Sequence, residues 1–123
     1  MAPSEFRYCA CYCEENIWHL CQDHRLKKDS NIVIFISNDS RQCAISNQKS
    51  GNDGFVIWDY HVVLLNKGDI WDFDTLLPFP CPAGEYLKKS FVSGIGNEYD
   101  PMFRLVDAVT FVRSFSSDRS HMI

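Results

Sequence analysis

The sequence predicts an α+β fold in which a helix near the N-terminus packs on an antiparallel sheet. Two patterns support this prediction. Apolar residues recur at helical spacing after residue 13, and apolar runs at 31–37, 55–65 and 70–74 have the length and composition of strands. The 123 residues suffice for a packed core, and 46% of them are hydrophobic. We therefore expect one globular domain over residues 1–123.

The first predicted element is a helix that begins at Cys13. One of its faces collects the apolar and thiol-bearing positions and a histidine: Cys13, Ile17, Leu20, Cys21 and His24. Glu14 and Glu15 suit its first turn, where carboxylates meet the positive end of the helix dipole. Free backbone N–H groups and the dipole at a helix N-terminus lower the pKa of a thiol, although neighbouring glutamates act in the opposite direction.

Two strands are predicted next. Residues 31–37 (NIVIFIS) form a continuous apolar run, which is typical of a buried strand. Residues 41–54 begin as a short strand and continue into a polar loop that contains glycine.

A predicted hairpin follows, with a long strand at 55–65, a turn at 66–69 and a second strand at 70–74. The first strand carries two polar residues on one face, Asp59 and His61. Burying a charge and an imidazole in such a strand is costly unless they are paired. We therefore expect a polar partner for His61 across the hairpin.

Asp72 and Asp74, on one face of the second strand, are the candidate partners. If the turn centres on residues 66–67, His61 lies opposite Asp72. If the loop is all of 66–69, His61 lies opposite Asp74, with Asp72 as its diagonal neighbour. Opposite residues lie about 5 Å apart and diagonal ones about 7–8 Å, so the pattern leaves both pairings open. A histidine satisfied within the core, without a function, is the alternative.

The spacing of apolar residues predicts secondary structure less clearly in the C-terminal third of the chain. Residues 84–105 predict a weak helix and a loop. Residues 105–115 predict a strand or a short helix that leads into the block SSDRSHM. Within that block, Asp118 and Arg119 are most simply a surface ion pair.

Composition narrows the function classes. A net charge of −4 and a pI near 5.4 provide no broad positive field for nucleic acid or anionic lipid. The N-terminus lacks the apolar run of a secretory signal, and the longest apolar run is far too short to span a bilayer. We expect a monomer in the cytosol or nucleus, without nucleic-acid or membrane partners.

Six cysteines are expected to be thiols, because disulfides are rare in a reducing compartment. Cys9, Cys11 and Cys13 are spaced C-x-C-x-C and are followed by Cys21. Zinc sites usually pair their ligands two to four residues apart and add a second pair further on, and no such second pair follows here. We therefore expect no metal.

Cysteine at a helix start, then histidine, then aspartate is the order found in papain-like and transglutaminase-like thiol enzymes. Four blocks extend this likeness: CYCEENIW, VIWDYHVVLL, DFDTLLPFPCP and SFSSDRSHM. Together they resemble the family of protein N-terminal glutamine amidohydrolases, from about Tyr12 to Met122. The resemblance implies a papain/transglutaminase-like α+β core. It also implies hydrolysis of the side-chain amide of an N-terminal glutamine to glutamate and ammonia, which feeds the N-degron degradation pathway.

This resemblance assigns roles to three residues. The family's nucleophile lies in the CEEN block, here Cys13, and its histidine lies in the WDYH block, here His61. Its aspartate is the first one in the D-x-D-T block, here Asp72. The other N-terminal cysteines are then bystanders. No cofactor is implied, and the partners are proteins or peptides with a free N-terminal glutamine.

Recognition of the free α-ammonium group of such a substrate needs an anion or carbonyl groups in the cleft. Glu15 and Asp74 are the candidates for this role. Trp58, Tyr60 and Phe79 are apolar neighbours that could wall the cleft, with packing as the simpler interpretation of each.

Family members continue beyond the SDRSHM block, whereas this chain ends at Ile123. We therefore expect the chain to lack the family's C-terminal portion. One alternative function is then a non-catalytic or unstable short form. A second alternative is another papain-like or transglutaminase-like thiol acyltransferase or peptidase, which would act on internal amides.

Overall fold

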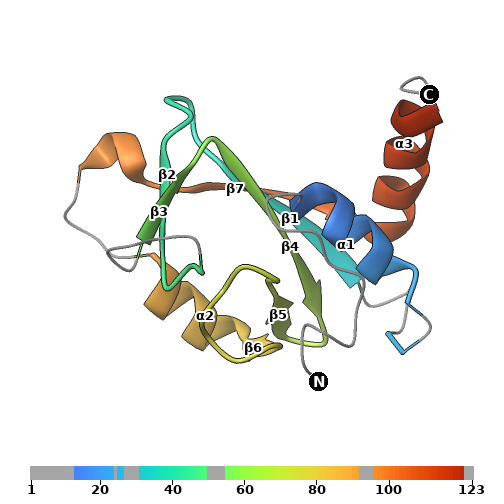
Figure 1. The fold of residues 1–123 in the computed structure, drawn as a ribbon, viewed down its shortest axis with the longest axis horizontal. Coiled ribbons are helices and arrows are strands. Elements are labelled where there is room, and N and C mark those ends of the chain that lie inside the picture. The colour runs from blue at the N-terminus through green and yellow to red at the C-terminus, as the bar shows by residue number, and fades with distance from the viewer. Residues whose placement is uncertain (1–12, 24, 27–30, 50–54, 92–95, 121–123) are drawn as a thin grey trace.

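The computed structural model describes residues 13–23, 25–26, 31–49, 55–91 and 96–120. Its elements follow the chain in this order: α1 (Cys13–Cys21), β1 (Asn31–Ser37), β2 (Cys43–Ser46), β3 (Phe55–Trp58), β4 (Tyr60–Asn66), β5 (Asp69–Trp71), β6 (Cys81–Pro82), α2 (Ala83–Ser90), the 3₁₀ helix η3 (Asn97–Tyr99), β7 (Met102–Asp107) and α3 (Ala108–Ser120). Five strands pair antiparallel in the order β6-β5-β4-β1-β7, and β2 and β3 form a separate ribbon (Figure 1). The α+β prediction with an antiparallel sheet is confirmed.

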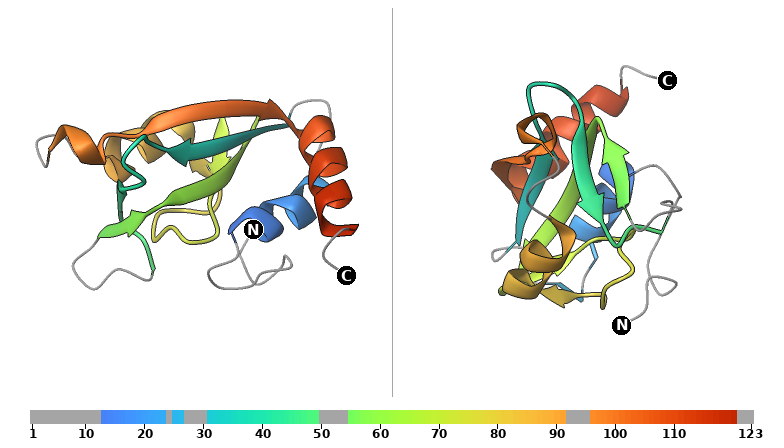
Figure 2. Two further views of the ribbon diagram at one scale, coloured as in Figure 1. Left: turned by 90° about the horizontal axis from the view of Figure 1, so that it is seen from above. Right: turned by 90° about the vertical axis from the view of Figure 1, so that its left-hand side faces the viewer.

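Helix α1 packs on the sheet as its apolar face predicts. Ile17 and Leu20 are buried in one core cluster with Val62 and Leu64 of β4. Figure 2 shows α1 and α3 side by side at one end of the sheet, where Trp18 Nε1 donates a hydrogen bond of 3.3 Å to a backbone carbonyl of α3. The predicted last residue of the helical face, at position 24, lies outside the described residues.

Strand β1 has the predicted bounds, and its continuous apolar run is explained by cores on both sides of the sheet. Val33 and Phe35 face the cluster that contains α1. Ile34 and Ile36 face a second cluster, which includes residues of the β2–β3 ribbon and of α2. Because successive side chains of a strand point to opposite faces, a strand between two cores is apolar throughout.

The predicted long strand at 55–65 is wrong as a single element, because the chain bends at Asp59. Strand β3 pairs with β2, whereas β4 pairs with β1 and β5. The Asp59 carboxylate accepts a hydrogen bond of 2.8 Å from the backbone N–H of Tyr60. Such a local side-chain bond competes with the strand ladder and favours a bend.

The hairpin of β4 and β5 settles the register that the pattern left open. Asn66 pairs with Asp69, so the four-residue alternative holds and the two central residues form a tight turn. Lys67 and Gly68 both have positive φ, 51° and 83°, as two-residue hairpin turns require. In this register His61 would lie opposite Asp74 if the ladder continued.

The ladder does not continue, because β5 ends at Trp71 and the predicted strand at 70–74 is too long. Asp72 Oδ1 accepts a hydrogen bond of 2.9 Å from the backbone N–H of Asp74. This contact turns the chain directly after the strand. Both aspartates therefore sit in a turn and not on a strand, and the turn decides where each carboxylate points.

The C-terminal third is more regular than predicted. The segment expected as a weak helix and a loop contains α2, η3 and the sheet strand β7. Asp107 ends β7 and caps α3, since its Oδ2 accepts hydrogen bonds of 3.1 and 3.3 Å from the backbone N–H groups of Val109 and Thr110. In the described parts of the chain, no helix is both long and apolar enough to cross a membrane.

Candidate active site

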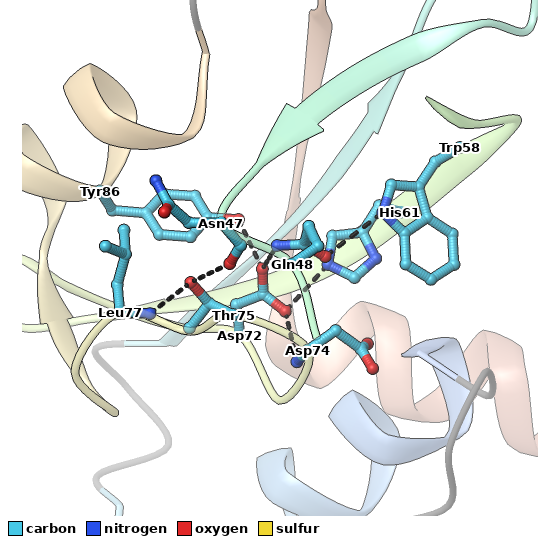
Figure 3. Close-up of polar contacts among 9 residues, drawn as sticks. All are labelled: Asn47, Gln48, Trp58, His61, Asp72, Asp74, Thr75, Leu77 and Tyr86. Atoms are coloured by element: carbon cyan, nitrogen blue, oxygen red, sulfur yellow. Dashed lines mark hydrogen bonds and ion pairs between the residues drawn. The ribbon is translucent and has the colours of Figure 1, made fainter. Parts of the chain in front are cut away.

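A buried imidazole–carboxylate pair lies beside β4, the middle strand of the five-stranded sheet. His61 is fully buried on β4, and its Nε2 lies 2.9 Å from Asp72 Oδ1 (Figure 3). Since Nε2 faces an acceptor, it carries a proton in either charge state of the ring, which fixes the neutral tautomer. Nδ1 is then the ring nitrogen that can exchange a proton with another group.

Asp72 is held by four donors. Its Oδ1 accepts from His61 Nε2 and from the Asp74 backbone N–H, and its Oδ2 accepts from Tyr86 Oη at 2.7 Å and from Gln48 Nε2 at 3.1 Å. Burial acts to raise the pKa of Asp72, but the charge of His61 and the hydrogen bonds from His61, Tyr86 and Asp74 hold it below its ordinary value. The carboxylate therefore stays ionised next to the imidazole.

Trp58 covers the imidazole. The two rings stack with centroids 4.6 Å apart and planes 25° from parallel. Trp58 Nε1 also donates to Gln48 Oε1 at 3.3 Å. An indole at this position keeps the ring plane of His61 fixed and excludes water from one of its faces.

Cys13 is the first residue of α1, and its side chain lies outside what the structure describes. Its neighbour in the chain is placed, however. Glu14 Oε1 accepts a hydrogen bond of 3.2 Å from Tyr60 Oη, and Tyr60 directly precedes His61 on β4. The start of α1 and the strand position next to His61 are thus tied together.

The remaining predicted site residues fall in different places. Asp74 is buried beside His61 and Asp72, with ligand atoms of the three side chains within 4.8 Å of one another. Glu15 lies on α1 and pairs with His19, with 3.7 Å between Oε1 and Nε2. Phe79 packs against the rings of Trp71 and Phe73, so it belongs to the core and not to a cleft wall.

A model of the N-terminal glutamine amidase family matches residues 8–123. The chain belongs to this family. It is 42% identical over 127 residues to the protein N-terminal glutamine amidohydrolases of Bos taurus and Homo sapiens, which covers 94% of this chain and 61% and 62% of those relatives. The Drosophila melanogaster protein of the same name is 39% identical, over 97% of this chain and 64% of the relative. The chain thus spans about three fifths of the length of these relatives.

Three other cysteines of this family member are placed, and all are inert in character. Cys21, Cys43 and Cys81 are buried free thiols. Burial raises the pKa of Cys21 to about 12 and that of Cys43 and of Cys81 to about 11. Buried thiols with such values carry almost no thiolate at neutral pH. Cys9 and Cys11 lie outside the described residues.

Among the described side chains, His61, Asp72 and Asp74 are the group that is close enough to hold a metal ion. Both oxygens of Asp72 already accept two hydrogen bonds each. A cation bound to Asp72 would have to displace hydrogen-bond donors that already satisfy both of its carboxylate oxygens.

Sequence reasoning missed Gln48 and Tyr86, which supply two of the four donors to Asp72. Gln48 lies in the segment expected to be a polar loop, and Tyr86 lies in the segment expected to be a weak helix. The sequence pattern does not mark either polar residue as buried. Their burial, with at most 1% exposure for each, can be seen only in the folded structure.

Proposed function

We propose that the chain acts on proteins or peptides with an N-terminal glutamine and hydrolyses the side-chain amide to glutamate and ammonia. The observation that carries this proposal is the buried His61–Asp72 pair, whose histidine lies on β4, the strand against which the helix beginning at Cys13 packs. The amidohydrolases that the chain resembles support the choice of substrate. The reaction feeds the N-degron pathway, and we place it in the cytoplasm and nucleus, performed by a monomer without a cofactor.

The arrangement also supports a papain/transglutaminase-like core as the finer description of the fold. In such cores a cysteine at a helix start works with a histidine and an acid or amide carried by an antiparallel sheet. Here α1 packs on β4, and β4 and the turn after β5 supply His61 and Asp72. Cysteine, histidine and aspartate then form a triad in this chain order.

Each triad residue has a defined task in the proposed reaction. The Cys13 thiol transfers its proton to His61 Nδ1, while Asp72 holds Nε2–H and stabilises the imidazolium. The thiolate attacks the side-chain amide carbon of the glutamine. Backbone N–H groups at the start of α1, beginning with that of Cys13, stabilise the resulting oxyanion.

Collapse of this intermediate breaks the carbon–nitrogen bond, and the imidazolium gives its proton to the leaving ammonia. A γ-glutamyl thioester on Cys13 remains. His61 then takes a proton from water, whose oxygen attacks the thioester carbon, and the proton returns to the departing sulfur. The balance is one amide and one water consumed for one carboxylic acid and one ammonia.

We propose that three further residues, Trp58, Asp74 and Glu15, bind the substrate. Trp58 walls the site, supported by its stacking on His61. A carboxylate is proposed to bind the α-ammonium group of the substrate, with Asp74 and Glu15 as the candidates. The burial of Asp74 beside the pair supports it more directly than the helix position of Glu15, which engages His19.

A peptide panel tests this function. We expect ammonia release from a peptide that starts with glutamine and none from its N-acetylated form, because the acetyl group removes the ammonium. A peptide that starts with asparagine should react about 100-fold more slowly, because its carbonyl lies one methylene nearer the ammonium and misses the thiolate by about 1 Å. Equal release from all three peptides, or from internal glutamine, would refute the proposal.

A further inference from the structure

The Asp72 carboxylate is surrounded by side chains from separate elements of the fold. His61 approaches it from β4, Tyr86 from α2 and Gln48 from the segment after β2 (Figure 3). Tyr86 and Gln48 reach only Oδ2, on the side away from His61. Neither belongs to the proposed triad, and both are buried, with 1% and 0% exposure.

Tyr86 acts as a hydrogen-bond donor toward Asp72. Burial raises the pKa of its phenol well above the ordinary value, and the charge of Asp72 raises it further. The hydroxyl therefore remains protonated throughout the working pH range. Its 2.7 Å contact with Oδ2 is a short, charge-assisted hydrogen bond. The ring itself packs in the second core cluster, which fixes the position of the hydroxyl.

Gln48 is fixed at both ends of its amide. Oε1 accepts from Trp58 Nε1, so the NH₂ group must be the end that points to Asp72. Its backbone segment is fastened to the turn that carries Asp72, because Lys49 N–H donates to the Asp74 carbonyl at 2.8 Å and Gln48 pairs with Thr75 in an isolated β-bridge. Trp58 in turn stacks on His61, so Gln48 contacts both Asp72 and the residue that covers the imidazole.

We propose that Tyr86 and Gln48 are positioning residues that keep Asp72 ionised and oriented under His61, and thereby set the pH at which Cys13 becomes a reactive thiolate. This inference rests on the proposed function only for the identity of the nucleophile. Among the side chains that the structure describes, the titratable groups that face Asp72 are His61 from β4, Tyr86 from α2 and Asp74 from its own turn.

The direction of the effect follows from charge. A buried carboxylate that loses a donor is less stable in its ionised form, so the pKa of Asp72 rises and its charge is lost at a higher pH. A neutral Asp72 does not stabilise the imidazolium, and the thiolate disappears with the imidazolium. Removal of either donor therefore moves the acidic limit of Cys13 reactivity to higher pH.

The test measures alkylation of Cys13 by iodoacetamide across the acidic and neutral range, with the site read by mass spectrometry of the full 123-residue chain. Tyr86→Phe and Gln48→Met each remove the donor and keep most of the volume. We expect the pH midpoint of reactivity to rise by about one unit in each variant, which is about a tenfold lower rate on its acidic side. Tyr99→Phe, in η3, and Gln42→Met, at an exposed position, are matched controls that should leave it unchanged.

Two donors on different elements keep the test decisive if one variant folds poorly, which circular dichroism reports. Wild-type midpoints in both folded variants would overturn the inference. An ordinary thiol profile for Cys13 in the wild type would overturn both the inference and the proposed function. A shifted profile in a chain that releases no ammonia from glutamine peptides would uphold the inference and refute the function. In the deamidation assay Tyr86→Phe should lower kcat and leave KM unchanged, since Tyr86 bonds Asp72 and none of the residues proposed to bind the substrate. Gln48→Met also removes the acceptor of Trp58 Nε1, so its effect is measured by the pH midpoint alone.

Discussion

At the scale of single residues, Asp72 and Asp74 were both candidates for the partner of His61. In the sequence, only the family resemblance favoured Asp72. Hairpin geometry allowed either Asp72 or Asp74 to face His61, and the observed register favours Asp74 as the opposite residue. The turn reverses that expectation, because Asp72 bonds the Asp74 backbone and swings its own carboxylate to His61. Local turn chemistry of this kind is invisible to periodicity.

The ranking of triad substitutions tests this assignment. His61→Ala should abolish deamidation, because the base and the acid are lost together. Asp72→Asn should lower kcat by about three to four orders of magnitude, since the amide favours the wrong imidazole tautomer. Asp74→Asn should cost about tenfold, the scale of one lost hydrogen bond. Steady-state ammonia release measures all three, and a larger loss for Asp74→Asn than for Asp72→Asn would identify Asp74 as the orienting carboxylate.

The individual elements were predictable to different degrees. Helix α1 and strand β1 follow directly from apolar spacing, and both begin where predicted. The break at Asp59 was not predictable, because the same apolar run serves the β2–β3 ribbon before it and the main sheet after it. This break lets Trp58 fold over His61 from another sheet, so it creates part of the site.

Two glycines test the hairpin that sets the register. Gly68 has φ of +83° in the β4–β5 turn, and Gly84 lies in α2 without positive φ; an added Cβ meets nothing within 4 Å at either. Gly68→Ala should therefore lower the free energy of unfolding by about 1 kcal/mol through backbone strain alone. Gly84→Ala should raise it by about 0.5 kcal/mol, because alanine loses less entropy in a helix.

Denaturant titrations of the two glycine variants, followed by circular dichroism, give these differences. The opposite signs make each variant the control of the other. Equal stabilisation by both substitutions would show that Gly68 does not adopt the left-handed conformation, and the register of Asp72 relative to His61 would then lose its support.

On the scale of the whole molecule, the described sheet has an exposed edge at β7. Three large apolar residues of this strand are more than two fifths exposed: Met102 at 55%, Phe103 at 45% and Leu105 at 60%. The sequence showed that residues 102–107 contain apolar side chains but not that they form an edge strand, since edge and centre are decided by pairing across the chain. Unpaired edges of this composition promote association.

Aggregation on heating should therefore begin at β7. Leu105→Lys should raise the temperature at which light scattering increases, because a charge on an edge strand opposes pairing with another copy. Leu76→Lys is a suitable control, since Leu76 is equally exposed, at 62%, but lies outside the sheet. An equal effect of both substitutions would point to net charge and not to the edge.

The central claim is that Cys13, activated by His61 and Asp72, performs the deamidation. Its most direct test compares ammonia release from a glutamine-starting peptide by the wild-type chain, Cys13→Ala and Cys21→Ala. We expect release by the wild type and by Cys21→Ala, whose thiol is buried with a pKa of about 12, and none by Cys13→Ala. Release by Cys13→Ala at the wild-type rate, or loss of activity in Cys21→Ala alone, would contradict the claim.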